Sequence, residues 1–257
     1  MIPRIIHYCW FGRNPLPKSA LKCIDSWKKF FPDYEIKEWN ENNFNVNLIR
    51  YTKEAYEVKK YAFVSDYARF KILYENGGIY FDTDVKVIKS FDEIIAKGAF
   101  MGREAGAYLK NICYNYRGGG LAVAPGLGLG VYAGHPLYKE FLDLYDNLSF
   151  KNEDGSLNTK TIVSYTSEIL VNHGLGDDNQ HPQNIEGIWI YPSDVFCPMD
   201  HTRGGEVTIT SDTVSIHLYD ASWSDHSSFQ YKLHIIKKIL VRILGADFVE
   251  RLLKIFR

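Results

Sequence analysis

The chain has 257 residues, with 30 Lys and Arg against 31 Asp and Glu, so its formal net charge at pH 7 is −1. A charge this close to zero gives no global attraction to nucleic acid, and we predict no nucleic-acid partner. The length suits one sizeable α/β domain, or one domain with a short appendage.

Cysteine spacing and hydropathy indicate where the protein works. Four scattered cysteines without a CxxC pair favour reduced thiols in a cytoplasmic protein over a disulfide framework. Residues 1–10 are too short and too polar for a signal peptide, and no apolar run reaches the roughly 20 residues that span a bilayer. We therefore expect a cytoplasmic protein, soluble or peripheral on a membrane.

Strands and helices alternate through the first part of the chain. This alternation predicts an α/β fold with a mostly parallel sheet, helices on both faces and ligands outside the carboxyl ends of the strands. The predicted elements are a strand over Ile2 to Trp10, a loop over 11–15, a helix over Ser19 to Phe31, a strand over Tyr34 to Trp39, a turn over Asn40 to Asn43 and a helix over Tyr61 to Asn76 that Gly77 and Gly78 end.

Two carboxylates follow this helix, in the segment Tyr80-Phe81-Asp82-Thr83-Asp84-Val85. If the segment ends a buried strand, alternation sends Asp82 and Asp84 to the same side. Two acids so placed repel each other unless a cation sits between them. A hard divalent metal that leaves room for phosphate oxygens fits, which indicates an enzyme acting on a nucleotide diphosphate.

The helix before the acidic pair carries further polar residues. Ala62, Asp66 and Arg69 fall at i, i+4 and i+7 with Ser65 beside them, so a small residue, an acid and a base share one stripe. The alternative interpretation is a surface ion pair between Asp66 and Arg69, of little energetic value. Their position just before Asp82 favours a site.

The second part of the chain predicts more loops. The glycine-rich stretch 117–135 predicts loops and a tight strand on the far side of a cleft, rather than a phosphate cradle. Predicted elements follow: a helix from His135 to about Asn147, a surface loop over 149–158, a helix near Thr161 to His173 and a late strand over Val207 to His217.

Residues 231–257 are rich in Lys and Arg, with apolar residues at helical spacing. Such basic amphipathic helices either lie on an anionic membrane surface or pack on the domain with a solvated charged face. Both alternatives stay open from the sequence.

Three segments resemble a known family. The central one, Ser65 to Phe70 with Leu73 to Asp84, is similar to the sugar-binding region containing the DXD motif of glycosyltransferase family 32. The opening Ile2 to Trp10 and the closing Ile216 to Trp223 resemble the family's ends, so the resemblance spans roughly residues 2 to 224.

This resemblance implies a GT-A fold over residues 1–225, followed by C-terminal helices over 226–257, and assigns roles within it. Trp10 would stack on the donor base, Asp84 and His217 would bind Mn²⁺ or Mg²⁺, and Trp223 would close over the diphosphate. The implied catalytic residues are Asp66, Arg69, Asp82 and Asp84, the nucleotide-sugar-binding residues are Trp10, Phe11, Asn40, Ala62, Ser65, Asp66, Arg69, Asp82 and Trp223, and the metal ligands are Asp82, Asp84 and His217.

The sequence and the resemblance together predict a retaining, metal-dependent glycosyltransferase. It would move a hexose, with galactose or an N-acetylhexosamine favoured, from a UDP-sugar rather than GDP-mannose to a glycan or lipid-linked glycan. Bacterial capsule or O-antigen synthesis at the cytoplasmic face of the inner membrane is the expected setting. The alternatives are a non-catalytic nucleotide-sugar or glycan-binding protein of the same fold, and a nucleotide-sugar hydrolase. Each of the predicted site residues also has a purely structural interpretation. His217 would then be an ordinary strand-end histidine, and Trp10 and Trp223 would be core aromatics.

Overall fold

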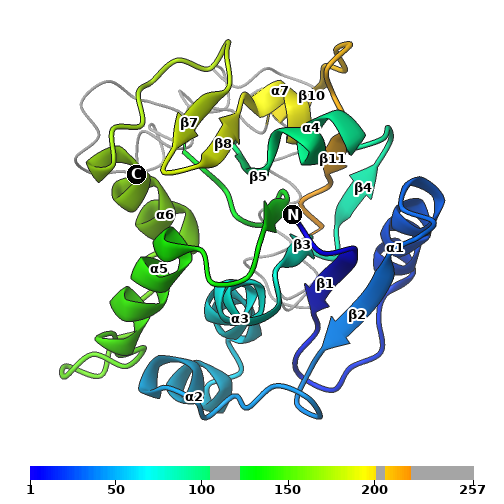
Figure 1. Ribbon diagram of the computed structural model, residues 1–257. Coiled ribbons are helices and arrows are strands. Elements are labelled where there is room, and N and C mark those ends of the chain that lie inside the picture. The colour runs from blue at the N-terminus through cyan, green and yellow to red at the C-terminus, as the bar shows by residue number, and fades with distance from the viewer. Residues whose placement is uncertain (105–121, 201–205, 221–257) are drawn as a thin grey trace, which may run out of the picture.

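A computed structural model describes residues 1–104, 122–200 and 206–220 of the chain. Its centre is a seven-stranded sheet in the order β2-β1-β3-β6-β5-β8-β7 (Figure 1). The strands of this sheet are β1 (Ile5–Cys9), β2 (Glu35–Trp39), β3 (Gly78–Tyr80), β5 (Ala99–Gly102), β6 (Leu129–Val131), β7 (Gln183–Ile185) and β8 (Ile188–Tyr191).

Five of the seven strands run in the same direction. β1 pairs in parallel with β2 and β3, and β5 pairs in parallel with β8, whereas β6 and β7 are antiparallel to their neighbours. The predicted α/β fold with a mostly parallel sheet is therefore confirmed. The first strand is shorter than expected, since it begins at Ile5 rather than Ile2.

Helices cover both faces of the sheet. Ile6 and Phe100 pack in one hydrophobic cluster with side chains of α1 (Lys18–Phe30), α4 (Asp92–Lys97) and α7 (Ser193–Phe196). Cys9 and Met101 pack in a second cluster, since alternate strand residues face opposite sides of a sheet. The helices that pack in this second cluster are α2 (Arg50–Glu57), α3 (Tyr61–Asn76), α5 (Pro136–Asp146) and α6 (Ile162–Asn172).

The helix predicted over Tyr61 to Asn76 is α3, with the same bounds. Gly77 ends it at a φ of 65°, a conformation that glycine adopts at little cost, and its N–H donates to the carbonyl of Leu73. The chain then enters β3, so α3 and the acidic segment after it are held next to each other.

Two predictions about strands are wrong. Asp82 and Asp84 do not end a strand: β3 stops at Tyr80, and the acids lie in a turn before β4 (Val85–Val87), closed by the N–H of Val85 donating to the carbonyl of Asp82 at 3.0 Å. The late strand over Val207 to His217 is two short strands, β10 (Glu206–Val207) and β11 (Ser215–His217).

A turn interrupts that late segment because hydroxyl groups compete for the backbone. Thr213 Oγ1 accepts from the N–H of Thr210, and Thr210 Oγ1 accepts from the N–H of Asp212. β11 instead pairs antiparallel with β4, and β10 pairs with β9 (Met199–Asp200). The pairing with β4 brings His217 next to the acidic turn.

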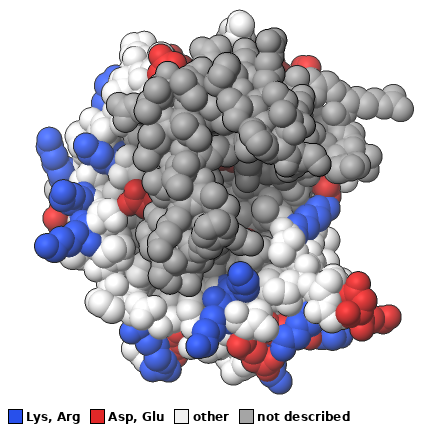
Figure 2. Space-filling model, turned by 180° about the vertical axis from the view of Figure 1, so that it is seen from behind, with Lys and Arg blue, Asp and Glu red and all other residues white. Residues whose placement is uncertain are grey.

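Charges of both signs occur on the face of the molecule shown in Figure 2. On the face in Figure 2, Lys and Arg side chains alternate with Asp and Glu side chains along the lower edge. Within the described ranges, no helix is both long and apolar enough to span a membrane. The predicted C-terminal basic helices and the boundary at residues 225 and 226 lie outside the described residues.

Candidate active site

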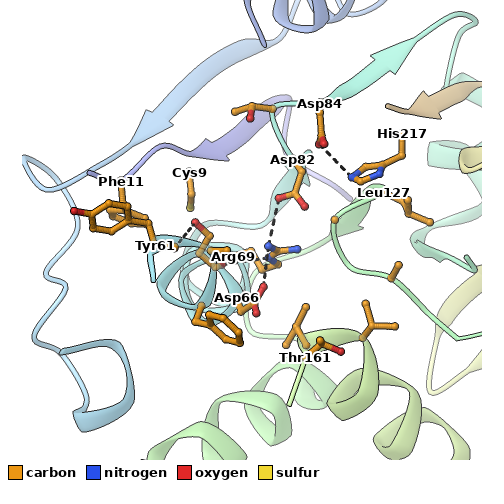
Figure 3. Close-up of a pocket in the computed structure, with 18 of the residues that line it drawn as sticks. Cys9, Phe11, Tyr61, Asp66, Arg69, Asp82, Asp84, Leu127, Thr161 and His217 are labelled. Carbon is orange, nitrogen blue, oxygen red and sulfur yellow. Dashed lines mark hydrogen bonds and ion pairs between the residues drawn. The ribbon is translucent and has the colours of Figure 1, made fainter. Parts of the chain in front are cut away.

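A cavity of about 550 Å³ opens where β1, the first half of α3 and the acidic turn meet (Figure 3). It lies beyond the carboxyl ends of β1 and β3, where ligands bind in sheets of this kind. Of the residues predicted for the site, Trp10, Phe11, Ala62, Ser65, Asp66, Arg69, Asp82, Asp84 and His217 line it.

Asp82, Asp84 and His217 form a group that is able to hold a metal ion. One ligand atom from each lies within 4.8 Å of the other two. His217 Nε2 is 3.1 Å from Asp84 Oδ1, and the two side chains point toward each other in Figure 3. Two carboxylate oxygens and one imidazole nitrogen suit Mn²⁺, and Mg²⁺ less well, because Mg²⁺ prefers an all-oxygen shell.

Electrostatics favour a positive charge in this group. Burial alone would lower the pKa of His217, but the adjacent Asp84, with Asp82 and Glu104, raises it to about 8. Burial alone would raise the pKa of Asp84, but the imidazole of His217 and a hydrogen bond from the Asp220 N–H hold it below its ordinary value. A bound cation would replace the protonated imidazole as the positive charge that balances the two carboxylates.

Arg69 joins the helix to the acidic turn. Its Nη2 lies 3.0 Å from Asp66 Oδ1 and 3.3 Å from Asp82 Oδ1, and its guanidinium lies over the Tyr80 ring at 5.0 Å from the centroid. Arg69 is only 4% exposed, so the alternative of a surface ion pair with Asp66 is wrong. A buried, bridging guanidinium has a fixed orientation.

Asp66 is an unusual carboxyl group because burial raises its pKa to about 7, against the opposing effect of Arg69. The N–H of Ile162, in the first turn of α6, donates to it. Thr161 caps the same helix by accepting from the N–H of Ser164. Asp66 thus connects α3 to the cavity wall formed by residues 161–163.

The end of the cavity nearest β1 is aromatic. Trp10 Nε1 donates to the carbonyl of Asn14 at 2.6 Å, which fixes the indole within the loop after β1. Gly12, at a φ of 99°, packs so tightly on Tyr61 that a Cβ would come within 2.4 Å of the ring. Phe11 packs edge-on against Phe44. The loop is therefore held against the start of α3.

The structure does not place two of the predicted donor-site residues in this cavity, for different reasons. Asn40 is outside the lining, and its side chain donates to Glu38 and accepts from the N–H of Asn42. Trp223 lies outside the described residues.

The prediction missed several lining residues: Glu104, Gly126, Thr161, Ile162, Val163 and Tyr219. Gly126 falls in the glycine-rich stretch that was expected to line the far side of a cleft, so the sequence held a signal for it. Glu104 is a single acid after β5. Nothing in its sequence context distinguishes it from an ordinary surface acid.

Comparisons with known proteins agree with this geometry. Residues 17–101 match the family "Glycosyltransferase sugar-binding region containing DXD motif". An uncharacterized glycosyltransferase of Acanthamoeba polyphaga mimivirus is 26% identical over 260 residues, covering 95% of this chain and 92% of the relative. Inositol phosphoceramide mannosyltransferase 3 of Schizosaccharomyces pombe is 28% identical over 118 residues, covering 43% of this chain and 32% of the relative. The chain thus spans about a third of that yeast protein.

Two solved structures are also similar. The PaToxG glycosyltransferase has 19% sequence identity and a TM-score of 0.48, with 66% of this chain and 69% of that chain covered. The galactosyltransferase LgtC, in complex with donor and acceptor sugar analogs, has 14% identity and a TM-score of 0.38, with 74% of each chain covered. Residues 17–101 thus carry a sugar-binding region with the DXD motif, and together with the relative that spans nearly the whole chain and the DXD turn at the cavity they identify the chain as a glycosyltransferase.

Proposed function

We propose that the protein is a metal-dependent, retaining glycosyltransferase with a GT-A type donor site, which moves a hexose from a nucleotide diphosphate sugar to a glycan. The observation that carries this proposal is the group of Asp82, Asp84 and His217, with ligand atoms within 4.8 Å of one another, in the same cavity as Arg69. Residues suited to ligating a metal and residues suited to binding a sugar therefore line the same cavity.

Asp82, Asp84 and His217 would hold Mn²⁺ or Mg²⁺. A divalent cation at such a site supplies Lewis-acid neutralisation of the charge that develops on a leaving diphosphate. Asp84 is the ligand best prepared for this, because its pKa is held low and its other oxygen is fixed by the Asp220 N–H at 3.1 Å. Asp82 is fixed by a hydrogen bond from the Tyr80 hydroxyl and by the ion pair with Arg69.

Arg69 and Asp66 would orient the donor sugar. The guanidinium is buried and held between Asp66 and Asp82, so its remaining N–H groups have a fixed direction toward hydroxyl or phosphate oxygens. With a pKa raised to about 7, the Asp66 carboxyl changes protonation near neutral pH, so it is able to donate a hydrogen bond to a sugar oxygen or accept one from a hydroxyl.

The aromatic end of the cavity would hold the nucleoside. Trp10 would stack on the base beside Phe11, while Ala62 and Ser65 leave room where the ribose enters. Trp10 is fixed by its bond to Asn14, which lowers the entropy cost of stacking. Asn40 and Trp223 remain candidates for further donor contacts.

The donor is proposed to be a UDP-sugar with galactose or an N-acetylhexosamine. Because two Schizosaccharomyces pombe relatives are named mannosyltransferases, GDP-mannose is the competing donor. Retention would follow from attack on the face that the diphosphate leaves, so the residues lining the cavity need only orient the two substrates. A glycan or lipid-linked glycan in capsule or O-antigen synthesis is the proposed acceptor, at the cytoplasmic face of the inner membrane with the C-terminal helices in contact with it.

Ligand-induced thermal stabilisation tests the donor site. Saturating UDP with Mn²⁺ should raise the melting temperature, because a ligand that binds only the folded state stabilises it. The same titration with GDP identifies the base that the site prefers. Asp84→Asn is the control, and it should lose the part of the melting-temperature increase that depends on Mn²⁺. If neither nucleotide shifts the melting temperature, the proposed donor site is wrong.

A further inference from the structure

The chain after β11 wraps around Asp84. The N–H of Leu218 donates to the Asp84 carbonyl at 2.9 Å, and the N–H of Asp220 donates to Asp84 Oδ2 at 3.1 Å. Tyr219, between them, has a backbone φ of 51°. Residues other than glycine rarely adopt this left-handed conformation. The surroundings of Tyr219 must impose this conformation, and strain of this kind concentrates at functional sites.

The phenol of Tyr219 is tethered at its far end. Its hydroxyl donates to Glu104 Oε1 at 2.5 Å and lies 3.1 Å from Cys197 Sγ. Glu104 lies two residues after the end of β5 and is fixed by its own N–H, which donates to the carbonyl of Ala122 at 2.7 Å. The central sheet thus fixes the position of Tyr219.

The ring of Tyr219 packs on His217, with centroids 4.1 Å apart and ring planes at 84°. His217 Nε2 faces Asp84, but His217 Nδ1 is buried and has no hydrogen-bond partner among the described residues. A histidine that binds a metal normally donates its second N–H to a carboxylate or carbonyl, and that bond fixes the ring. Here no such bond is made within the described residues, and the Tyr219 ring packs against the imidazole instead.

We propose that Glu104 and Tyr219 are positioning residues for the metal ligand His217. The hydrogen bond from Tyr219 to Glu104 holds the phenol ring against the imidazole and so keeps Nε2 directed at the cation. This inference rests on the proposed metal-dependent function, because it assigns a role to residues around that site. Neither residue belongs to the group of potential metal ligands.

Mn²⁺ affinity measured by electron paramagnetic resonance in the presence of UDP tests the proposal without measuring activity. Tyr219→Phe keeps the ring and removes its tether, so Mn²⁺ affinity should fall about tenfold, the lower end of the usual effect of outer-shell partners. Glu104→Ala should cause a similar loss, while Glu104→Gln, which keeps an acceptor for the hydroxyl, should restore affinity close to that of the wild type. The double variant Tyr219→Phe/Glu104→Ala should bind no more weakly than the weaker single variant.

Tyr191→Phe is the matched control. It removes a buried phenol hydroxyl that has no hydrogen-bond partner within the described residues, so Mn²⁺ affinity should not change. Melting temperatures of all variants verify folding. Unchanged affinity in folded Tyr219→Phe, or a loss in Glu104→Gln equal to that in Glu104→Ala, would overturn the positioning role. If the wild type itself binds no Mn²⁺ with UDP, the proposed metal-dependent function fails first.

Discussion

The backbone of Gly126 lies directly against the carboxylate of Asp82. A Cβ at Gly126 would be 2.1 Å from Asp82 Oδ2, and the N–H of Asp82 donates to the Gly126 carbonyl at 3.1 Å. The glycine-rich stretch thus has a specific role here, because it leaves room for one carboxylate and supports the turn that carries it. Any side chain at position 126 must displace the Asp82 carboxylate or shift the backbone of Gly126 itself.

Gly126→Ala should therefore impair the donor site with little loss of fold. Asp82 is the side chain that yields, since it is part-exposed and faces the cavity. We expect Mn²⁺-dependent UDP binding to weaken at least tenfold in calorimetric titrations, because a misplaced ligand atom disrupts metal coordination. Gly176→Ala is the control, because its added Cβ would lie 3.3 Å from the flexible end of Gln183. Equal binding by the two variants would contradict the close packing at Asp82.

Arg69→Met should destabilise the protein strongly. The substitution leaves Asp66 and Asp82 buried or part-buried without their shared cation, and breaking such a buried pair typically costs about 3 to 5 kcal/mol. Urea denaturation measures the change in the free energy of unfolding. Lys139→Met removes an exposed i,i+4 pair with Asp143 and should cause no measurable change. A loss below about 1 kcal/mol for Arg69→Met would contradict the bridging role.

His7 connects three segments behind the site. It is fully buried, its Nδ1 accepts from Trp39 Nε1 at 3.0 Å, and its Nε2 lies 2.9 Å from the carbonyl of Gly77. Because Nδ1 accepts, Nε2 carries the proton and donates to Gly77. This neutral ring holds β1, β2 and the start of β3 together, and burial lowers its pKa to about 4.

Stability should therefore fall on acidification through this histidine. The unfolded chain binds a proton at His7 below about pH 6.5, while the folded chain resists it until about pH 4, so the contribution is complete above pH 6.5 and is lost as pH falls toward 4. The loss between pH 7 and pH 4.5 amounts to roughly 2 to 3 kcal/mol. Denaturation of the wild type and His7→Gln at both values isolates this contribution from the carboxylates. If the two proteins lose equal stability on acidification, His7 is not the group responsible.

The sequence predicted the elements whose pattern is local. The helix over Tyr61 to Asn76 is correct to the residue because its apolar stripe and the Gly77 C-cap directly after it are both local features of the sequence. The strand over Tyr34 to Trp39 differs from β2 by one residue. The prediction of one late strand over Val207 to His217 is wrong. The alternation of apolar and polar residues gives no information about hydrogen bonds to the Thr210 and Thr213 hydroxyls, which stabilise a turn there.

The sequence predicted which residues belong to the site better than it predicted how they are arranged. Asp82 and Asp84 do share a cavity, although the reason is a turn closed by Val85 rather than the alternation of a strand. Burial of Arg69 and Asp66 could not be predicted, since the α6 turn that covers Asp66 lies about a hundred residues away in the chain. Glu104 is also beyond local sequence analysis, because Tyr219 meets it only after β11 folds back on β4.

Release of nucleoside diphosphate from a panel of nucleotide sugars tests the central claim most directly. With Mn²⁺ present and a glycan acceptor mixture added, the wild type should release UDP or GDP from one donor at a rate that rises with acceptor. EDTA should abolish release, and so should Asp84→Asn, which keeps the side-chain shape and the acceptor for the Asp220 N–H. Release without acceptor dependence would indicate a hydrolase. Release that persists in EDTA and in Asp84→Asn would contradict the metal role of Asp82, Asp84 and His217.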